Sequence, residues 1–239
     1  MNKTLAVARR ELGALFNSPM AYIVVVTFLL VSGWMLFSTL FLSERAELRA
    51  FFSPSLFSPA FLLVLLAPAV SMRLLAEERR SGTMELMASL PVRDVQVVLG
   101  KFLGVWALMA VALLVSTLFA LSVAWVGDLD WGPVVSGYLG MLLFVGAMLA
   151  IGLMCSAWTK NQIVAFIIAL LIGASLYVIN WLSLFVPTAL APFVESISSS
   201  AHLSNMARGV IDSRDVLYFL SLMAGALLVA ERSMARHHA

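Results

Sequence analysis

Residues 73–101 read RLLAEERRSGTMELMASLPVRDVQVVLGK and form the only long charged, turn-rich interval of the 239-residue chain. The interval holds nine of the 28 charged side chains (15 basic and 13 acidic). Apolar runs that are long enough to cross a bilayer flank it on both sides. Charge concentrated between two such runs indicates a cytoplasmic loop that is presented to a soluble partner.

The composition excludes a soluble domain. Hydrophobic residues make up 62% of the chain and charged residues 12%, whereas soluble domains are near half apolar and a quarter charged. Six apolar runs are present, at residues 20–42, about 55–72, 102–126, 134–156, 163–186 and 216–230. The last run has only 15 residues, so we expect it either to thin the bilayer or to continue through Ala235. These runs predict an all-α polytopic membrane protein with six transmembrane helices.

The basic residues set the expected orientation. With the N-terminus in the cytoplasm, that side receives 11 of the 15 Lys and Arg residues, all but Arg45, Arg49, Arg208 and Arg214. An even number of spans returns the C-terminus to the same side. The slight basic balance is thereby explained by topology and lipid headgroups, and it requires no nucleic acid as a partner.

Two segments outside the runs are predicted to lie at the membrane faces. Residues 3–17 carry apolar positions at helical spacing, which predicts an amphipathic elbow helix on the inner surface, within residues 1–18. A frayed extension of the first span is the alternative. Residues 187–215 mix apolar, serine-rich and charged stretches, which indicates a broken or re-entrant element on the outer face. No second domain is separated, so residues 1–239 are expected to form one membrane domain.

The chemistry that the sequence lacks limits the function. Gly100-Lys101 has neither the upstream glycine nor the following hydroxyl of a phosphate-binding loop, and one cysteine gives no metal-site spacing. The six runs contain no Asp, Glu, Lys, Arg or His, which disfavours an ion-coupled carrier because such carriers need charged or protonatable groups of these types within the membrane. We therefore expect no enzymatic activity in this chain, and work on a substrate would be powered from outside it.

The middle of the charged interval has the signals of a short helix. Ser81, Gly82 and Thr83 are typical of a helix start, Glu85 lies in the first turn where a carboxylate favours the helix dipole, and Pro91 ends the segment. Such a helix fits insertion into a groove of a cytoplasmic ATPase. An interfacial helix that rests on lipid headgroups explains the same pattern about equally well.

Specific motifs add a resemblance to a known family. The segment E-E-R-R-S-G-T-M-E-L-M-A-S-L-P, which runs into V-V-L-G-K, resembles the signature between spans two and three of ABC-2-type transporter permeases. The segments R-R-E-L-G-A-L-F-N-S-P-M-A-Y, T-K-N-Q-I-V-A-F and R-G-V-I-D-S-R-D-V-L-Y-F resemble the gliding-motility-associated, Gld-type branch. The matching positions of the signature are Glu78, Gly82, Thr83, Glu85, Leu86, Pro91, Gly100 and Lys101.

The resemblance implies a six-helix permease of the bacterial inner membrane, with an elbow helix and a cytoplasmic coupling helix near residues 82–90 within the loop 73–101. It also implies pairing with a second permease copy or a related permease subunit, and binding of an ABC-type ATP-binding subunit. ATP and Mg²⁺ would be bound by that subunit, so no cofactor is expected in this chain. The residues expected to couple to the ATPase are Glu77, Glu78, Arg79, Gly82, Thr83, Glu85, Leu86 and Pro91.

Three functions remain distinct at this point. The first is an ATP-driven exporter subunit that moves a substrate across the inner membrane. The second is a scaffold without cargo, driven by the same ATPase, whose segment 187–215 would dock a periplasmic protein. The third, a stand-alone carrier or scramblase, is disfavoured by the uncharged runs and by the long charged loop.

Overall fold

A computed structural model describes residues 3–43, 48–82, 93–185, 187 and 190–235. Within these residues the secondary structure is helical and contains no strand. Six helical segments are long and apolar enough to cross a membrane: Pro19–Phe41, Pro59–Ser81, Asp94–Val126, Trp131–Trp158, Gln162–Ser183 and Ser213–Ala235. The all-α polytopic fold predicted from the six apolar runs is therefore confirmed, and the chain is a multi-pass membrane protein.

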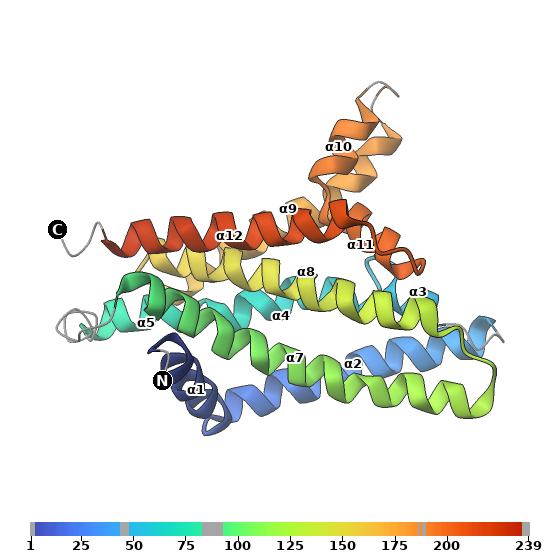
Figure 1. The fold of residues 1–239 in the computed structure, drawn as a ribbon, viewed down its shortest axis with the longest axis horizontal. Coiled ribbons are helices and arrows are strands. Elements are labelled where there is room, and N and C mark those ends of the chain that lie inside the picture. Colours follow the sequence, from blue (N-terminus) through green and yellow to red (C-terminus); the bar gives the residue numbers. More distant parts are fainter. Residues whose placement is uncertain (1–2, 44–47, 83–92, 186, 188–189, 236–239) are drawn as a thin grey trace.

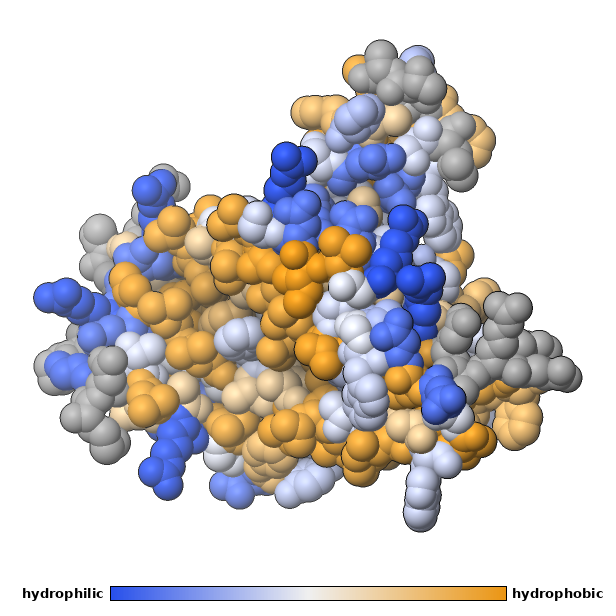
Figure 2. Space-filling model, turned by 45° about the vertical axis from the view of Figure 1, so that its right-hand side comes forward, coloured by the Kyte–Doolittle hydropathy of each residue, from blue (hydrophilic) through white to orange (hydrophobic). Residues whose placement is uncertain are grey.

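The spans lie side by side in one elongated bundle (Figure 1). Helix α1 (Lys3–Phe16), the end of α5 (Arg73–Ser81) and the end of α12 (Ser213–Ala235) lie at the same end, which we call the terminal end. Helices α2 (Pro19–Ser43) and α7 (Asp94–Val126) run from it toward the opposite end. Figure 2 shows apolar residues in a broad band over the bundle, with hydrophilic residues gathered at its ends.

Helix α8 (Trp131–Trp158) occupies the centre of the bundle, and 83% of the residues in its most apolar 18-residue stretch are buried. Four glycines let neighbouring elements approach its backbone. A β-carbon at each of them would lie 3.0 Å or less from an atom of another element. In lipid, helix association depends on such close packing because there is no water to drive apolar surfaces together. The contacts are Gly137 with Phe52 of α3 (Arg49–Phe52), Gly140 with Met206, Gly146 with Trp106 and Met223, and Gly152 with Ser71.

The second span differs from its predicted end. Residues from Arg73 onward were expected to form a loop, but α4 (Pro59–Ser71) is followed directly by α5, with a break at Met72. Ser156 of α8 inserts its hydroxyl at the break. Its Oγ donates to the Met72 carbonyl at 2.7 Å and accepts from the amides of Leu75 and Ala76 at 3.1 and 2.9 Å. Because a neighbouring side chain satisfies the freed backbone groups, the helix can continue past Met72 into the charged residues.

The helix predicted for residues 3–17 is present as α1, and it lies across α7 (Figure 1). Gly100 and Gly104, one turn apart on α7, form the crossing. A β-carbon at Gly100 would lie 2.6 Å from the Val7 side chain, and one at Gly104 would lie 3.0 Å from the Ala8 carbonyl oxygen. The two glycines therefore form a helix-packing contact, one of the uses of this spacing in membrane proteins.

The chain leaves the bundle between its last two spans. Helix α9 (Gln162–Val178) passes into the 3-10 helix η1 (Ile179–Leu184), and α10 (Ala191–Ile197) projects sideways from the bundle (Figure 1). Helix α11 (Ser199–Ala207) returns to pack on α8, where Ser136 Oγ donates to the Met206 carbonyl at 2.7 Å. The last apolar run lies in the 23-residue helix α12, which ends at Ala235, so of the two alternatives for this short run the structure shows the longer helix.

We predict that Gly104→Ala lowers the free energy of unfolding by about 1–3 kcal/mol, because the added methyl group overpacks the contact with the α1 backbone. Thermal unfolding of the purified chain in detergent measures this change, and limited proteolysis at residues 3–16 reports on α1 itself. Gly13→Ala on α1 is the matched control, since a β-carbon there meets nothing within 4 Å. Equal stability of the Gly104→Ala variant and the wild type would contradict the crossing.

Candidate functional site

The terminal end of the bundle is organised around Lys101 of α7. Its side chain is only 3% exposed, and its ammonium Nζ lies 2.8 Å from Glu11 Oε1 of α1 and 2.6 Å from Glu78 Oε1 of α5. Three helices that are far apart in the sequence thus meet at one cation. We call Glu11, Glu78 and Lys101 the charge clasp.

Local sequence explains why the clasp is buried. Lys101 directly follows Gly100, whose missing side chain lets α1 approach α7 closely enough to cover the lysine. Burying an ammonium group is costly unless it is paired and hydrogen-bonded, and both carboxylates supply that pairing here. Glu11 and Glu78 are each 22% exposed, so the carboxylates are less buried than the ammonium group that they pair with.

Arg79 ties the same helix to another part of the bundle. The residue is 9% exposed, and its Nη2 lies 3.4 Å from the Ser233 carbonyl oxygen of α12. Ser233 in turn donates from its Oγ to the Ala157 carbonyl of α8 at 3.0 Å. Adjacent residues of α5 therefore face different neighbours: Glu78 pairs with Lys101 of α7, which also pairs with Glu11 of α1, and Arg79 contacts α12.

The predicted coupling residues fall into three groups. Glu78 and Arg79 contact other helices of this chain, while Glu77 and Gly82 are exposed at the terminal end. Gly82 ends α5 with φ of +73°, a left-handed conformation that glycine adopts readily and that turns the chain away from the helix axis. The part of the predicted coupling helix beyond Gly82 lies outside the described residues. So do the other four predicted residues, Thr83, Glu85, Leu86 and Pro91.

Glu11 was not among the residues predicted to be functional. Its cationic partner, Lys101, lies 90 positions away in the sequence, where no local pattern points to it. One signal was available: Glu11 is the only acid in the basic segment before the first span. An isolated carboxylate in a helix that also carries Lys3, Arg9 and Arg10 suggests a specific cationic partner.

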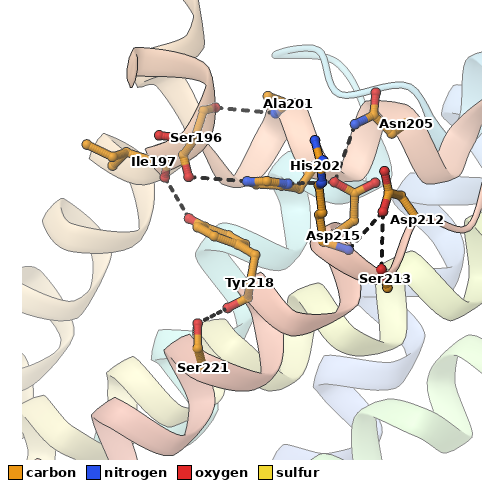
Figure 3. Close-up of polar contacts among 12 residues, drawn as sticks. Ser196, Ile197, Ala201, His202, Asn205, Asp212, Ser213, Asp215, Tyr218 and Ser221 are labelled. Carbon is orange, nitrogen blue, oxygen red and sulfur yellow. Dashed lines mark hydrogen bonds and ion pairs between the residues drawn. The ribbon is translucent and has the colours of Figure 1, made fainter. Parts of the chain in front are cut away.

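A second polar cluster lies at the other side of the bundle, where α10, α11 and α12 meet (Figure 3). His202 of α11 sits between two acceptors: Nδ1 lies 2.6 Å from Asp215 Oδ1, and Nε2 lies 3.2 Å from the Ser196 carbonyl oxygen. The ring can donate to both only as the imidazolium ion, with a proton on each nitrogen. Asp215 is buried and also accepts from Asn205 Nδ2 at 3.3 Å.

Tyr218 of α12 completes this second cluster. We call His202, Asn205, Asp215 and Tyr218 the outer cluster. The Tyr218 ring stacks on His202 with centroids 4.1 Å apart and an interplanar angle of 22°, and its hydroxyl donates to the Ile197 carbonyl at 2.6 Å. Helix α10, which has no buried residue, is therefore held at its C-terminal end by two hydrogen bonds to its carbonyls. The outer cluster lies within the segment 187–215 and the start of α12.

The outer cluster borders a polar pocket of about 500 Å³. Asn180 of η1, Arg208, Arg214 and Asp212 contribute to its wall together with His202 and Asp215. Across the described residues, no group of three or more His, Cys, Asp or Glu side chains is arranged to hold a metal ion.

Comparison with known proteins gives one family. The family model described as ABC-2 family transporter protein matches residues 46–230, well over half of the chain. The match includes α5, α7 and the outer cluster but not α1. A comparison with curated proteins found no match.

We predict that Lys101→Met destabilises the protein by about 2–3 kcal/mol, because it leaves two carboxylates side by side without the cation that pairs them. Adding Glu78→Gln to this variant should restore much of the lost stability. Thermal unfolding in detergent gives both values, with exposed Lys160→Met as the control that should change little. If the double variant were no more stable than Lys101→Met, the clasp would not be electrostatic.

We also predict that His202→Phe and Tyr218→Phe each loosen α10. Each variant removes one hydrogen bond to the end of the helix, worth about 1 kcal/mol, so amide exchange in residues 191–197 should become about fivefold faster. Hydrogen–deuterium exchange of the purified chain measures this. Ser221→Ala is the control, because its hydroxyl bonds only within α12, to the Tyr218 carbonyl. Unchanged exchange in both variants would show that other contacts hold α10.

Proposed function

The chain belongs to the ABC-2 family of transporter proteins, and we propose that it is the permease subunit that an ATP-binding partner drives to export a substrate. In this proposal the partner hydrolyses ATP, and this chain converts the resulting movement into a change in its six spans. ATP and Mg²⁺ would be held by the partner. The absence of ionisable residues from the centres of the six apolar runs supports an outside source of energy.

The charge clasp is the observation that carries the proposal. Helix α5 leads directly into the segment whose sequence resembles the coupling signature, and its last turns are tied to α1 and α7 by Lys101 and to α12 by Arg79. A displacement of the segment that follows Gly82 would act on four helices at once. Coupling between sites is carried by such networks of packed and charged residues when they join rigid elements.

The predicted coupling residues divide into two proposed roles. Glu77 and Gly82, which are exposed, and Thr83, Glu85, Leu86 and Pro91 would contact the ATP-binding subunit. Glu78 and Arg79 would act as positioning residues, because they hold α5 against the rest of the bundle. Lys101 and Glu11 join them in that second role.

Orientation and assembly follow from the same proposal. The terminal end would face the cytoplasm of a bacterial cell, as the 11 basic residues on that side favour, and the outer cluster would face the periplasm. A second permease, identical or related, would complete the path. The segments R-R-E-L-G-A-L-F-N-S-P-M-A-Y and R-G-V-I-D-S-R-D-V-L-Y-F support assignment to the gliding-motility-associated branch.

We predict that Glu85→Lys abolishes retention of the ATP-binding subunit while membrane insertion is unchanged, because the substitution reverses the charge at a residue that the proposal assigns to the contact with the partner. The measurement is co-purification from detergent-solubilised membranes, followed by assay of ATPase activity in the eluate. Glu195→Lys makes the same charge change on α10 and should retain the partner as the wild type does. Full retention by the Glu85→Lys variant would argue against this contact.

The same experiment separates the alternative functions. A correctly inserted chain that retains no ATPase, even after crosslinking in intact membranes, would favour a stand-alone carrier. Retention of the ATPase together with crosslinks from 187–215 to a periplasmic protein, without movement of a substrate, would favour the scaffold. Loss of the ATPase only in the Glu85→Lys variant supports the permease.

A further inference from the structure

An apolar groove of about 560 Å³ lies where α1 crosses the bundle. Leu5 and Leu12 of α1 form one wall, Leu103 and Trp106 of α7 the other, and Leu142 of α8 closes one side. These wall residues are half-buried or exposed, so the groove is open at the surface of the bundle. Its volume is in the range of sites that take small ligands.

The wall of the groove is apolar except at one place. The indole Nε1 of Trp106 already donates to the Leu142 carbonyl at 3.0 Å, so the ring presents its apolar face. Arg9 of α1 is the one charged residue in the wall. It is exposed and forms no ion pair among the described residues, whose salt bridges involve Glu11, Glu78 and Asp215 instead.

An apolar channel with one exposed guanidinium at its edge matches one class of molecule. A phospholipid with an anionic headgroup combines acyl chains with a phosphate, and Arg binds phosphate through charge-assisted, often bidentate hydrogen bonds. Helix α1 is amphipathic and basic, with Lys3 and Arg10 beside Arg9, which is the composition of helices that lie in the interface of anionic membranes.

We propose that this groove is a binding site for an anionic phospholipid, with one acyl chain between α1 and α7 and the headgroup phosphate at Arg9. The bound chain would fill the space beside the Gly104 crossing and contact both α1 and α7. The lipid would thereby support the same contact that buries Lys101. The inference goes beyond the transport function. It depends on the proposed orientation only in one respect, namely that the inner leaflet supplies the lipid.

Trp106 provides a direct readout, because bromine atoms on an acyl chain quench indole fluorescence at close contact. The full-length chain would be placed in symmetric phosphatidylcholine nanodiscs that contain increasing fractions of brominated phosphatidylglycerol or, separately, brominated phosphatidylcholine. The signal of Trp106 is the difference between the wild type and Trp106→Phe. Symmetric bilayers make the result independent of the orientation of the protein and of any ATPase partner.

We expect half-maximal quenching of Trp106 at about a fivefold lower fraction of phosphatidylglycerol than of phosphatidylcholine, the effect of roughly one basic residue at an anionic surface. Arg9→Gln should abolish this difference, and Arg80→Gln, which is exposed on α5 and outside the groove, should retain it. Equal quenching by both lipids in the wild type would mean ordinary solvation by the bilayer and would overturn the proposal. Absence of quenching by either lipid would overturn it too, since the groove would then be covered by protein, such as a second copy.

Discussion

Close approach of helix backbones at glycine is the constraint on which the rest of this structure depends. Within a bilayer there is no water to drive apolar surfaces together, so the bundle is held by packing and by satisfied polar groups. Glycines on α8 admit α3, α4, α7, α11 and α12 to one central helix. At Gly152 this approach also brings Ser156 within reach of the α4–α5 break, where its hydroxyl serves three backbone groups.

The same constraint creates the charge clasp. Gly100 and Gly104 allow α1 to lie on α7, and the approach removes Lys101 from solvent. Once the ammonium group is buried, carboxylates must accompany it, because an unpaired buried charge costs several kcal/mol. Glu11 and Glu78 meet that need from two other helices. The packing of α1 on α7 is thereby extended to α5. Helix α5 in turn leads, along the chain, into the segment that we propose contacts the ATPase.

The two polar clusters differ in what they connect. The charge clasp and Arg79 join α5 to α1, α7 and α12 at the terminal end. The outer cluster joins the short α10 to α11 and α12 through His202 and Tyr218, while the rest of α10 projects away from the bundle. Under the proposed function, the more densely connected terminal end would receive the displacement from the ATP-binding subunit.

Hydropathy alone determined the six spans, the common side of the two termini and the position of the charged interval, because the length and polarity of a segment decide whether it can cross a bilayer. For the short last run the sequence left two alternatives, and the structure shows that the helix extends to Ala235. Sequence did not reveal that the helix continues from Arg73 to Ser81, that Lys101 is buried, or that His202 pairs with Asp215. Those features were decided by the tertiary structure, because the burial of a charge depends on which helices approach it, and the carboxylates that pair with Lys101 lie on other helices, 23 and 90 positions away along the chain.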